Sequence, residues 1–441
     1  MKIAYTVYKY VSGVLFMALF PLYRVYARLK KQDRDDLRQR LGMYAHHLHR
    51  VAAGTPQIWI HAVSVGEVSA ASSVVEALRR QMPRCRIIFS TTTAHGYAAA
   101  RQKLGHRVTL IFAPFDFILA VRRALRTFRP DVFVCLETEL WPNWLVEAHR
   151  AGIRTALVNG RISVRSIKGY LRIKPLMQFT LAHVDAFSMI CEADARRVKL
   201  LGAPAQRVFV NGNAKYDALP FRPDRRAIEI LRQQYGLSAS EPVFLAGSTR
   251  HDEETIILDA YERVRKQVPG LLLVIAPRHV ERAPQIKRLV ETYGLPCQLR
   301  TELLQLANVR TAPVVIMDTM GELEITYGIA SIVFCGGSLV PLGGQNILEA
   351  AVWGKPVLYG PSMDDFLEAR ILLENAQAGI QVQDGEELAV QVEYFLTHPR
   401  QAQVIGLRAQ AVVRSNFGAA MKHAAVIQNM IQGEQVQACG R

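Results

Sequence analysis

Residues 335–361 read CGGSLVPLGGQNILEAAVWGKPVLYGP and carry more information about the fold than any other part of the chain. The apolar residues 331–335 predict a buried strand, and residues 356–359 predict the next one. Between them, a glycine-rich turn leads into residues 346–353, which have the composition of a helix. Doubly wound α/β sheets repeat this unit and hold ligands at such turns. The stretch therefore predicts a parallel-sheet domain with a nucleotide-sugar pocket.

The glycines and the one carboxylate of this stretch indicate how a ligand would be held. Backbone freedom is needed where main-chain N–H groups approach a phosphate, and the glycines that supply it are Gly336, Gly337, Gly343 and Gly344. Glu349 would lie about one turn into the following helix, where a carboxylate can accept hydrogen bonds from ribose hydroxyls. Glycine-rich turns of this kind also occur in α/β proteins without a ligand, and that alternative stays open.

Length and composition bound the class of protein. A chain of 441 residues exceeds what one core usually supports, so we expect two domains. The formal net charge of +16 predicts an anionic partner, which could be nucleic acid, anionic lipid or a phosphorylated substrate. The six cysteines are widely scattered without a CxxC pair, which predicts reduced thiols in a cytosolic protein and no zinc site.

The N-terminus carries an apolar segment of a different kind. Residues 11–23 (VSGVLFMALFPLY) are almost free of charge, but they fall short of the roughly 20 residues that span a bilayer as a helix. Basic residues follow between Arg24 and Arg40, a flank suited to an anionic cytoplasmic leaflet. Residues 24–36 (RVYARLKKQDRDD) offer only a poor small-residue site for signal-peptide cleavage. We expect an uncleaved membrane anchor or interfacial helix, with a buried core helix as the alternative.

Apolar runs alternate with helical patterns along the rest of the chain. This alternation predicts two Rossmann-like domains with parallel sheets. Two prolines and a charge run in residues 217–226 mark the boundary. We therefore expect an N-terminal anchor with its basic flank over residues 1–40, one domain over 41–220, and a second over 221–441 whose last helix is able to pack back on the first.

Carboxylates follow predicted strands in the first half. Glu67 comes directly after the first strand, where it could take a proton from a hydroxyl or simply stabilise the start of a helix. Glu137 and Glu139 follow a later strand, and two neighbouring carboxylates need a cation such as Lys215 or Arg161. A catalytic cluster and a structural ion network are both compatible with this pattern.

The second half supplies cations at strand ends. Residues 247–250 (GSTR) bring Ser248 and Arg250, and residues 276–279 (APRH) bring Arg278. Arginines beside helix N-termini bind phosphate oxygens. With a further polar loop at residues 318–323, three loops are predicted to converge at one edge of a sheet.

Seven motifs now make a family resemblance visible, and it extends over about residues 5 to 420. The motifs are HAVSVGE, ETELWPN, NGRIS, GSTR followed by EE, APRH, MGEL, and GGQNILEAA with GKPVLYGP. In this order they closely resemble those of the Kdo (3-deoxy-D-manno-octulosonic acid) transferases of Gram-negative bacteria. The resemblance implies a GT-B glycosyltransferase with two Rossmann-like domains facing across a cleft and a membrane-anchor helix. It also implies transfer of Kdo from CMP-Kdo to the lipid A precursor lipid IVA, in lipopolysaccharide core biosynthesis at the cytoplasmic face of the inner membrane.

The resemblance also assigns roles to residues. Glu67 matches the general base, Glu137 and Lys215 match positions that stabilise the transition state, and Glu139 matches less firmly. Ser248 and Arg250 would help to hold the phosphate. The other residues that match CMP-binding loops are Pro277, Arg278, Met320, Gly321, Glu322, Asn346, Ile347, Leu348 and Glu349. Such enzymes resemble inverting, metal-independent transferases without a cofactor, so we expect no metal site, although two aspartates at 364 and 365 occur in a loop.

Two other classes of function remain to be separated from this one. A GT-B transferase or epimerase that uses a UDP-sugar would share the glycine turn and the Glu349 type of carboxylate. A basic nucleic-acid- or membrane-binding protein without enzymatic activity would account for the charge. However, its arginines should form one run with interleaved aromatics, and here they do not. The expected partners are therefore CMP-Kdo, lipid IVA and an anionic membrane surface, and no nucleic acid.

Overall fold

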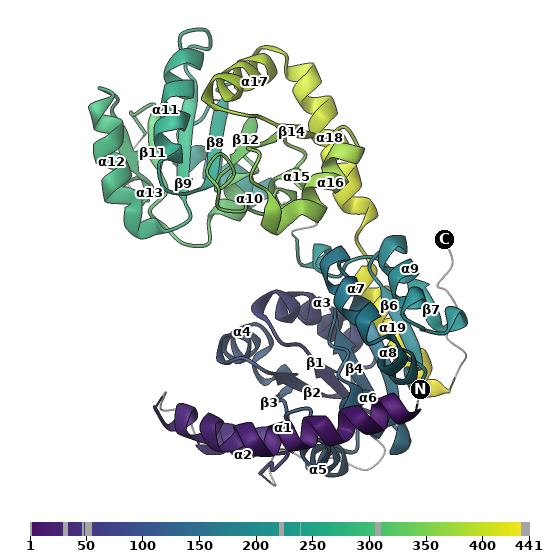
Figure 1. Cartoon of the computed structure of the whole chain (residues 1–441). Coiled ribbons are helices and arrows are strands. Elements are labelled where there is room, and N and C mark those ends of the chain that lie inside the picture. The colour runs from purple at the N-terminus through teal and green to yellow at the C-terminus, as the bar shows by residue number, and fades with distance from the viewer. Residues whose placement is uncertain are drawn as a thin grey trace. The chain divides into compact units, whose positions relative to one another are not determined.

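The computed structural model describes residues 2–29, 34–45, 48, 55–219, 225–238, 240–304 and 310–433. The chain forms two compact units, Met1–Ala218 with Asn416–Arg441 and Leu219–Ser415. Each unit contains one seven-stranded parallel sheet covered by helices, which confirms the predicted pair of Rossmann-like domains (Figure 1). Lys30 and Lys31 of the basic flank, and residues 220–224 of the expected boundary, lie outside the described residues.

The first unit has the strand order β3-β2-β1-β4-β5-β6-β7. Its strands are β1 (Gln57–His61), β2 (Arg86–Thr91), β3 (Thr109–Phe112), β4 (Val132–Leu136), β5 (Arg154–Gly160), β6 (Ala186–Met189) and β7 (Val208–Val210). Its helices are α1 (Lys2–Leu29), α2 (Arg34–Arg40), α3 (Val65–Gln81), α4 (Ala94–Leu104), α5 (Ile118–Phe128), α6 (Pro142–Arg150), α7 (Val164–Arg172), α8 (Lys174–Leu181), α9 (Glu192–Leu200) and α19 (Ala419–Gln432).

Two apolar layers explain why these strands read as continuous hydrophobic runs. Alternate residues of β1 and β4, such as Ile60 and Val134, pack with α3, α4 and α19 on one face. Their neighbours Trp59 and Phe133 pack with α5, α6, α8 and α9 on the other. Strands buried on both faces lack the polar alternation of a half-exposed sheet. The last helix, α19, comes back from the end of the chain and lies against α3.

The second unit has the strand order β10-β11-β9-β8-β12-β13-β14. Its strands are β8 (Val243–Thr249), β9 (Leu272–Pro277), β10 (Cys297–Leu299), β11 (Val314–Ile316), β12 (Ile332–Cys335), β13 (Val357–Tyr359) and β14 (Gly379–Gln381). Its helices are α10 (Arg225–Gln234), α11 (Glu253–Val264), α12 (Ala283–Thr292), α13 (Arg300–Leu303), α14 (Leu323–Thr326), α15 (Leu348–Ala351), α16 (Leu367–Asn375), α17 (Gly385–Thr397) and α18 (Pro399–Ser415). Helices α11, α12 and α17 cover one face of the sheet.

The helix predicted over residues 346–353 is shorter than expected. Only α15 is helical, because Trp353 and Gly354 already make tight i to i−3 hydrogen bonds, and Gly354 adopts a positive φ of 71°. Glu349 therefore lies in the first turn of α15 and not one turn further on. With only one turn of helix, α15 contributes little macrodipole, and individual N–H groups must attract an anion instead.

Helix α1 runs lengthwise along the outside of the first unit (Figure 1). It is attached by specific contacts: the Tyr8 hydroxyl donates to Asp116 Oδ2 over 2.6 Å, and Phe16 stacks on Phe117 with ring centroids 4.5 Å apart. Asp116 is half-buried, and desolvation raises its pKa to about 7, against the hydrogen bonds from Tyr8 and two backbone N–H groups. These contacts hold α1 as a part of the unit along much of its length.

The other side of α1 is apolar and exposed. Residues Lys2–Val25 have a mean hydropathy of 1.5, which makes them long and apolar enough to cross a membrane, yet only 6% of this stretch is buried in the protein. The exposed large apolar side chains are Ile3, Val7, Tyr10, Val11, Val14, Leu15, Met17, Leu19, Leu22 and Val25. Because α1 is attached to the first unit along one side, its exposed apolar side chains form a hydrophobic strip that runs along the surface of that unit.

Candidate functional site

Each sheet has one place where the strand order reverses direction. In the first unit the chain leaves β1 for β2 and β3 and returns to the other side of β1 at β4, and in the second unit β8 and β12 are related in the same way. Ligands of open α/β sheets bind at the carboxyl ends of strands beside such a reversal. Glu67 follows β1 and Glu137 follows β4, whereas Arg250 follows β8 and the glycine-rich stretch follows β12.

Glu137 and Lys215 form an ion pair at this edge of the first sheet. Lys215 Nζ lies 2.6 Å from Glu137 Oε1. Glu137 has a positive φ of 50°, which is strained for a residue with a side chain and recurs at functional sites. Asn159 fixes the segment before Lys215 by accepting a hydrogen bond from Ala214 N over 2.8 Å. The structure thus pairs Glu137 with Lys215, one of the two cations predicted to compensate it.

Glu139 lies in a different environment although it is only two residues away. Its Oε2 atom accepts a hydrogen bond of 2.5 Å from Trp141 Nε1 and lies 3.9 Å from His61 Nε2. Burial, followed by the negative charge of Glu67, raises the pKa of Glu139 to about 7. Burial also lowers the pKa of His61 to about 4, so this histidine is neutral and does not compensate the carboxylate.

Glu67 lies in the first turn of α3, which confirms the prediction that its carboxylate stabilises the start of a helix. Ser64 is the N-cap and accepts from Glu67 N, while Glu67 accepts from Val63 N over 2.8 Å and from Ser64 Oγ over 2.9 Å. This reciprocal arrangement resembles a capping box, but the carboxylate accepts from the N–H of the residue before the N-cap and not from that of Ser64 itself. Burial raises the pKa of Glu67, against these hydrogen bonds, and Glu137 and Lys215 both act on it electrostatically. Each carboxylate oxygen keeps a second lone pair, so the cap does not exhaust the side chain as an acceptor.

The first half of the glycine-rich stretch is occupied by the protein itself. The fully buried carboxylate of Glu253 accepts from the backbone N–H groups of Gly337, Ser338 and Leu339 over 2.5 to 2.9 Å. It also accepts from Arg250 N over 3.0 Å. The expectation that the glycines at 336 and 337 bring N–H groups to a phosphate is therefore wrong, because an internal anion already fills that place. The glycine at 336 instead permits close approach to β8, since a Cβ there would lie 2.6 Å from Thr249 Cα.

The second half of the stretch is open to a ligand. Within the described part of the chain, no acceptor lies within hydrogen-bonding distance of the backbone N–H groups of Gln345, Asn346 and Ile347. Asn346 Nδ2 donates to Glu349 Oε1 over 3.3 Å. Burial raises the pKa of Glu349, and the positive charge of Arg278 opposes that shift. The structure thus brings together Arg278, Asn346 and Glu349 from the loops after β9 and β12.

The remaining residues predicted to bind CMP differ in which of their atoms a ligand could contact. Ser248 has a positive φ of 58°, and Arg250 Nε is buried without a hydrogen-bond partner among the described residues. Pro277, Ile347 and Leu348 are buried, so their side chains belong to the core and only their backbone is available to a ligand.

The Met320 loop contains an ion pair that the motifs did not reveal. Met320 is 76% exposed, and Gly321 has a positive φ of 85°. The carboxylate of Glu322 is engaged by Arg300 Nε over 3.0 Å and by the Thr319 hydroxyl. Arg300 is 1% exposed, so the pair shapes the loop and leaves little of the Glu322 carboxylate for a nucleotide.

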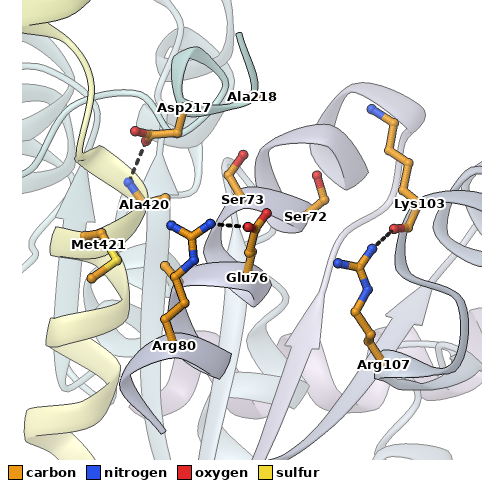
Figure 2. A pocket seen from close by; sticks show the side chains of 11 residues that line it. Ser72, Ser73, Glu76, Arg80, Lys103, Arg107, Asp217, Ala218, Ala420 and Met421 are labelled. Carbon is orange, nitrogen blue, oxygen red and sulfur yellow. Dashed lines mark hydrogen bonds and ion pairs between the residues drawn. The ribbon is translucent and has the colours of Figure 1, made fainter. Parts of the chain in front are cut away.

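A pocket of about 430 Å³ is lined by residues of α3, α4 and α19 together with Arg107, Asp217 and Ala218. Figure 2 shows Ser72, Ser73 and the ion pair of Glu76 with Arg80 on one wall, with Lys103 and Arg107 on the other. None of the predicted site residues is among the residues that line it. This pocket is therefore separate from the carboxylate and lysine cluster.

Comparisons with known proteins agree with the motifs. Residues 35–218 match the family model described as 3-deoxy-D-manno-octulosonic-acid transferase (kdotransferase). The 3-deoxy-D-manno-octulosonic acid transferase of Haemophilus influenzae is 31% identical over 388 residues, which cover 88% of this chain and 89% of that protein. The enzyme of the same name from Bordetella pertussis is 29% identical over 375 residues, which cover 82% of this chain and 84% of that protein.

Solved structures add evidence on the fold alone. The UDP-GlcNAc 2-epimerase from Neisseria meningitidis superimposes with a TM-score of 0.57 at 15% identity, over 86% of this chain and 100% of that one. Its arrangement supports the GT-B architecture implied by the two parallel sheets. On the evidence of the relatives, the chain belongs to the 3-deoxy-D-manno-octulosonic acid transferase family and is a glycosyltransferase, as its motifs predicted.

Proposed function

We propose that this glycosyltransferase moves Kdo from CMP-Kdo to lipid IVA in lipopolysaccharide biosynthesis, with inversion and without a metal. The observation that carries the proposal is the cluster of Glu67, Glu137, Glu139 and Lys215 at the carboxyl edge of the first sheet. Membership in a family named for this transfer supplies the sugar. It also removes the alternative of a binding protein without enzymatic activity.

Glu67 is the proposed general base. As a glucosamine hydroxyl of the acceptor attacks the anomeric carbon of Kdo, its proton passes to the carboxylate of Glu67, and the bond from that carbon to the CMP phosphate oxygen breaks. CMP leaves with the electron pair as an anion and needs no proton, so a single displacement with one base is sufficient. Because burial raises the pKa of Glu67, it is a stronger base than an exposed glutamate.

Lys215 and Glu137 are proposed to stabilise the transition state. The ammonium of Lys215 is the cation of the cluster, and charge that develops near it during the displacement is stabilised if the ammonium is already in place. The 2.6 Å contact with Glu137 holds it there.

The second unit is proposed to hold the donor. Arg250, with its unpartnered Nε atom, and Arg278 supply cations, and the N–H groups of residues 345–347 supply donors for phosphate oxygens. Glu349 is the proposed acceptor for the ribose hydroxyls. No group of three or more His, Cys, Asp or Glu side chains among the described residues is arranged to hold a metal ion.

Helix α1 is proposed to lie in the interface of the inner membrane at its cytoplasmic face. Its attached side contacts the first unit from Tyr5 to Tyr23, which favours a helix parallel to the membrane plane over one that crosses it. Its exposed side chains would enter the acyl region, and the basic residues after it would approach anionic headgroups. This position keeps the enzyme close to an acceptor that stays in the bilayer.

Mass spectrometry of lipid IVA incubated with the protein tests the proposed substrates. We expect the mass of Kdo to be added with CMP-Kdo, with a strong chelator present or absent, and nothing to be added with UDP-GlcNAc. Loss of product in chelator and its recovery with magnesium would contradict the metal-independent mechanism. Transfer from the UDP-sugar would favour the other donor class that the glycine turn allows.

A further inference from the structure

We propose that an arginine-lined pocket beside the N-terminal end of α1 binds the phosphate headgroup of an anionic glycerophospholipid. The pocket measures about 840 Å³ and lies in the first unit, where the ends of α5 and α6 meet the start of β5. It rests on the proposed membrane docking of α1, but on none of the residues proposed for Kdo transfer.

Five arginines line this pocket, and only two of them are ion-paired, both with the same carboxylate. Arg122 and Arg150 both bind the buried carboxylate of Glu147, over 2.5 Å and 2.7 Å. The other three are Arg126, Arg129 and Arg154, and no carboxylate among the described residues lies within ion-pair distance of them. Asp131, the second acid that lines the pocket, forms no ion pair with these three within the described residues, and its Oδ2 atom accepts a hydrogen bond from Gln57 N over 2.7 Å.

Helix dipoles do not account for this concentration of charge. Arginines in the last turn of a helix commonly complement the negative end of its dipole, and Arg126 in α5 and Arg150 in α6 fit that description. Arg129 follows α5 with a left-handed backbone, and Arg154 begins β5. Guanidinium groups from three elements therefore converge on one cavity, as in sites that bind phosphate oxygens in a bidentate manner.

The pocket adjoins the helix proposed to lie in the membrane. The Tyr5 hydroxyl of α1 donates to Glu147 Oε1 over 3.4 Å, and the Arg150 guanidinium lies 5.2 Å above the Tyr5 ring. The exposed apolar side of α1 begins at the same end with Ile3 and Val7. A lipid whose acyl chains lie against this side would have its headgroup at the level of the arginines.

The pocket lies at a different edge of the first sheet from the proposed reaction site. Residues 130–131 of the pocket precede β4, and residues 152–153 precede β5, which begins at Arg154. Glu67 and Glu137, in contrast, follow the carboxyl ends of β1 and β4. Parallel strands place these two sets at opposite edges of the sheet. A headgroup bound here would orient the protein on the bilayer and would not be the reacting acceptor.

The test replaces Arg126 and Arg129 together by lysine in the full-length protein. This change keeps the charge but removes the forked geometry of guanidinium. We expect affinity for phosphatidylcholine vesicles that contain phosphatidylglycerol to fall roughly 10-fold in a flotation assay. Replacing both by glutamine should lower it roughly 30-fold. The matched control replaces Arg400 and Arg408, exposed on α18 in the second unit, by lysine and should float like the wild type.

Three results would overturn the proposal. If the Arg126→Lys, Arg129→Lys variant bound vesicles like the wild type, the arginines would attract the membrane only through their charge and no headgroup pocket would exist. The proposed docking of α1 on the membrane would not be affected by this result. A variant that loses inorganic phosphate binding in calorimetry but keeps its vesicle affinity would assign the pocket to a soluble phosphate. A wild type that fails to float would overturn both this proposal and membrane docking, whereas Kdo transfer to detergent-dispersed lipid IVA would remain a separate question.

Discussion

Glu67, Glu137 and Glu139 lie near one another, yet the fold treats each carboxylate differently. Glu137 is compensated by Lys215, Glu67 is stabilised by the start of α3, and Glu139 has an indole donor but no cation. Carboxylates in such unequal environments have different pKa values, and this allows one to be a base while another stays fixed as a charge. At the residue scale, the structure therefore shows an ion-paired Glu137 beside a Glu139 whose pKa is raised to about 7.

The titration of Glu139 predicts a pH dependence of stability. Its pKa is about 7 in the folded protein against an ordinary 4.5, so the folded state binds the proton more tightly between these values. The stabilisation is complete below about 4.5 and is lost as the pH rises through about 7. Between about pH 5 and about pH 8, wild type should lose about 1 to 3 kcal/mol more stability than Glu139→Gln. Urea unfolding at both pH values measures this, with Glu76→Gln on the exposed face of α3 as control.

At the level of single residues, the proposed donor site depends on Arg278 and Glu349. Glu349→Ala and Arg278→Ala should each weaken CMP binding by about 1 to 3 kcal/mol, because each removes a charge-assisted hydrogen bond. Calorimetric titration with CMP gives the affinity directly. Arg263→Ala, an exposed arginine on α11, serves as control. If CMP affinity were unchanged in both variants, the donor site would have to lie elsewhere.

At the scale of elements, Glu253 connects the loop after β8 with the loop after β12. Glu253→Ala should leave four backbone N–H groups without an acceptor, destabilise the second unit by about 3 kcal/mol and weaken CMP binding. Formate should restore part of the CMP affinity, because the emptied place is lined by convergent N–H donors. Glu262→Ala on the same helix is the control and should not respond to formate. CMP binding at wild-type affinity in Glu253→Ala would show that the two loops do not need this anion.

The exposed side of α1 gives a second prediction at this scale. Val14→Glu together with Met17→Glu places two charges on the proposed lipid-facing side, where the side chains are 71% and 67% exposed. Flotation with anionic vesicles should fall by more than about 10-fold, since both apolar contacts are replaced by charges that must stay hydrated. CMP binding should be unchanged. The matched control, Val404→Glu with Leu407→Glu on α18, should float normally, and equal losses in both variants would argue against α1 as the docking element.

The sequence predicts the regular part of this fold well because long apolar runs between helical patterns leave few other interpretations. It does not reveal β10 and β14, the two edge strands of the second sheet, whose three residues each are only partly buried and lack a continuous apolar run. The sequence also suggests a bound phosphate at Gly336 and Gly337, where the structure has the carboxylate of Glu253. The two glutamates at positions 253 and 254, shortly after GSTR, are the available signal for Glu253, but only the fold shows that this side chain reaches the N–H groups of another loop. The buried pair of Arg300 with Glu322 is missed for the same reason.

At the scale of the whole molecule, two similar sheets carry different chemistry at their carboxyl edges. The first unit supplies carboxylates and Lys215, and the second supplies arginines, free N–H groups and Glu349. This division matches a reaction in which one substrate must be deprotonated and the other is an anion that must be held. The excess of cations over the whole chain suits the proposed donor, acceptor and membrane surface, which are all anionic.

The most direct test of this account measures transfer of Kdo from CMP-Kdo to lipid IVA by Glu67→Gln beside the wild type. Glutamine keeps the size and can still accept the hydrogen bond from Val63 N, but it cannot take a proton, so turnover should fall by roughly 100-fold or more. CMP affinity should stay the same, and Glu76→Gln on the same helix should turn over like wild type. Wild-type turnover in Glu67→Gln would contradict the account, because the carboxylate at the start of α3 would then serve only the helix.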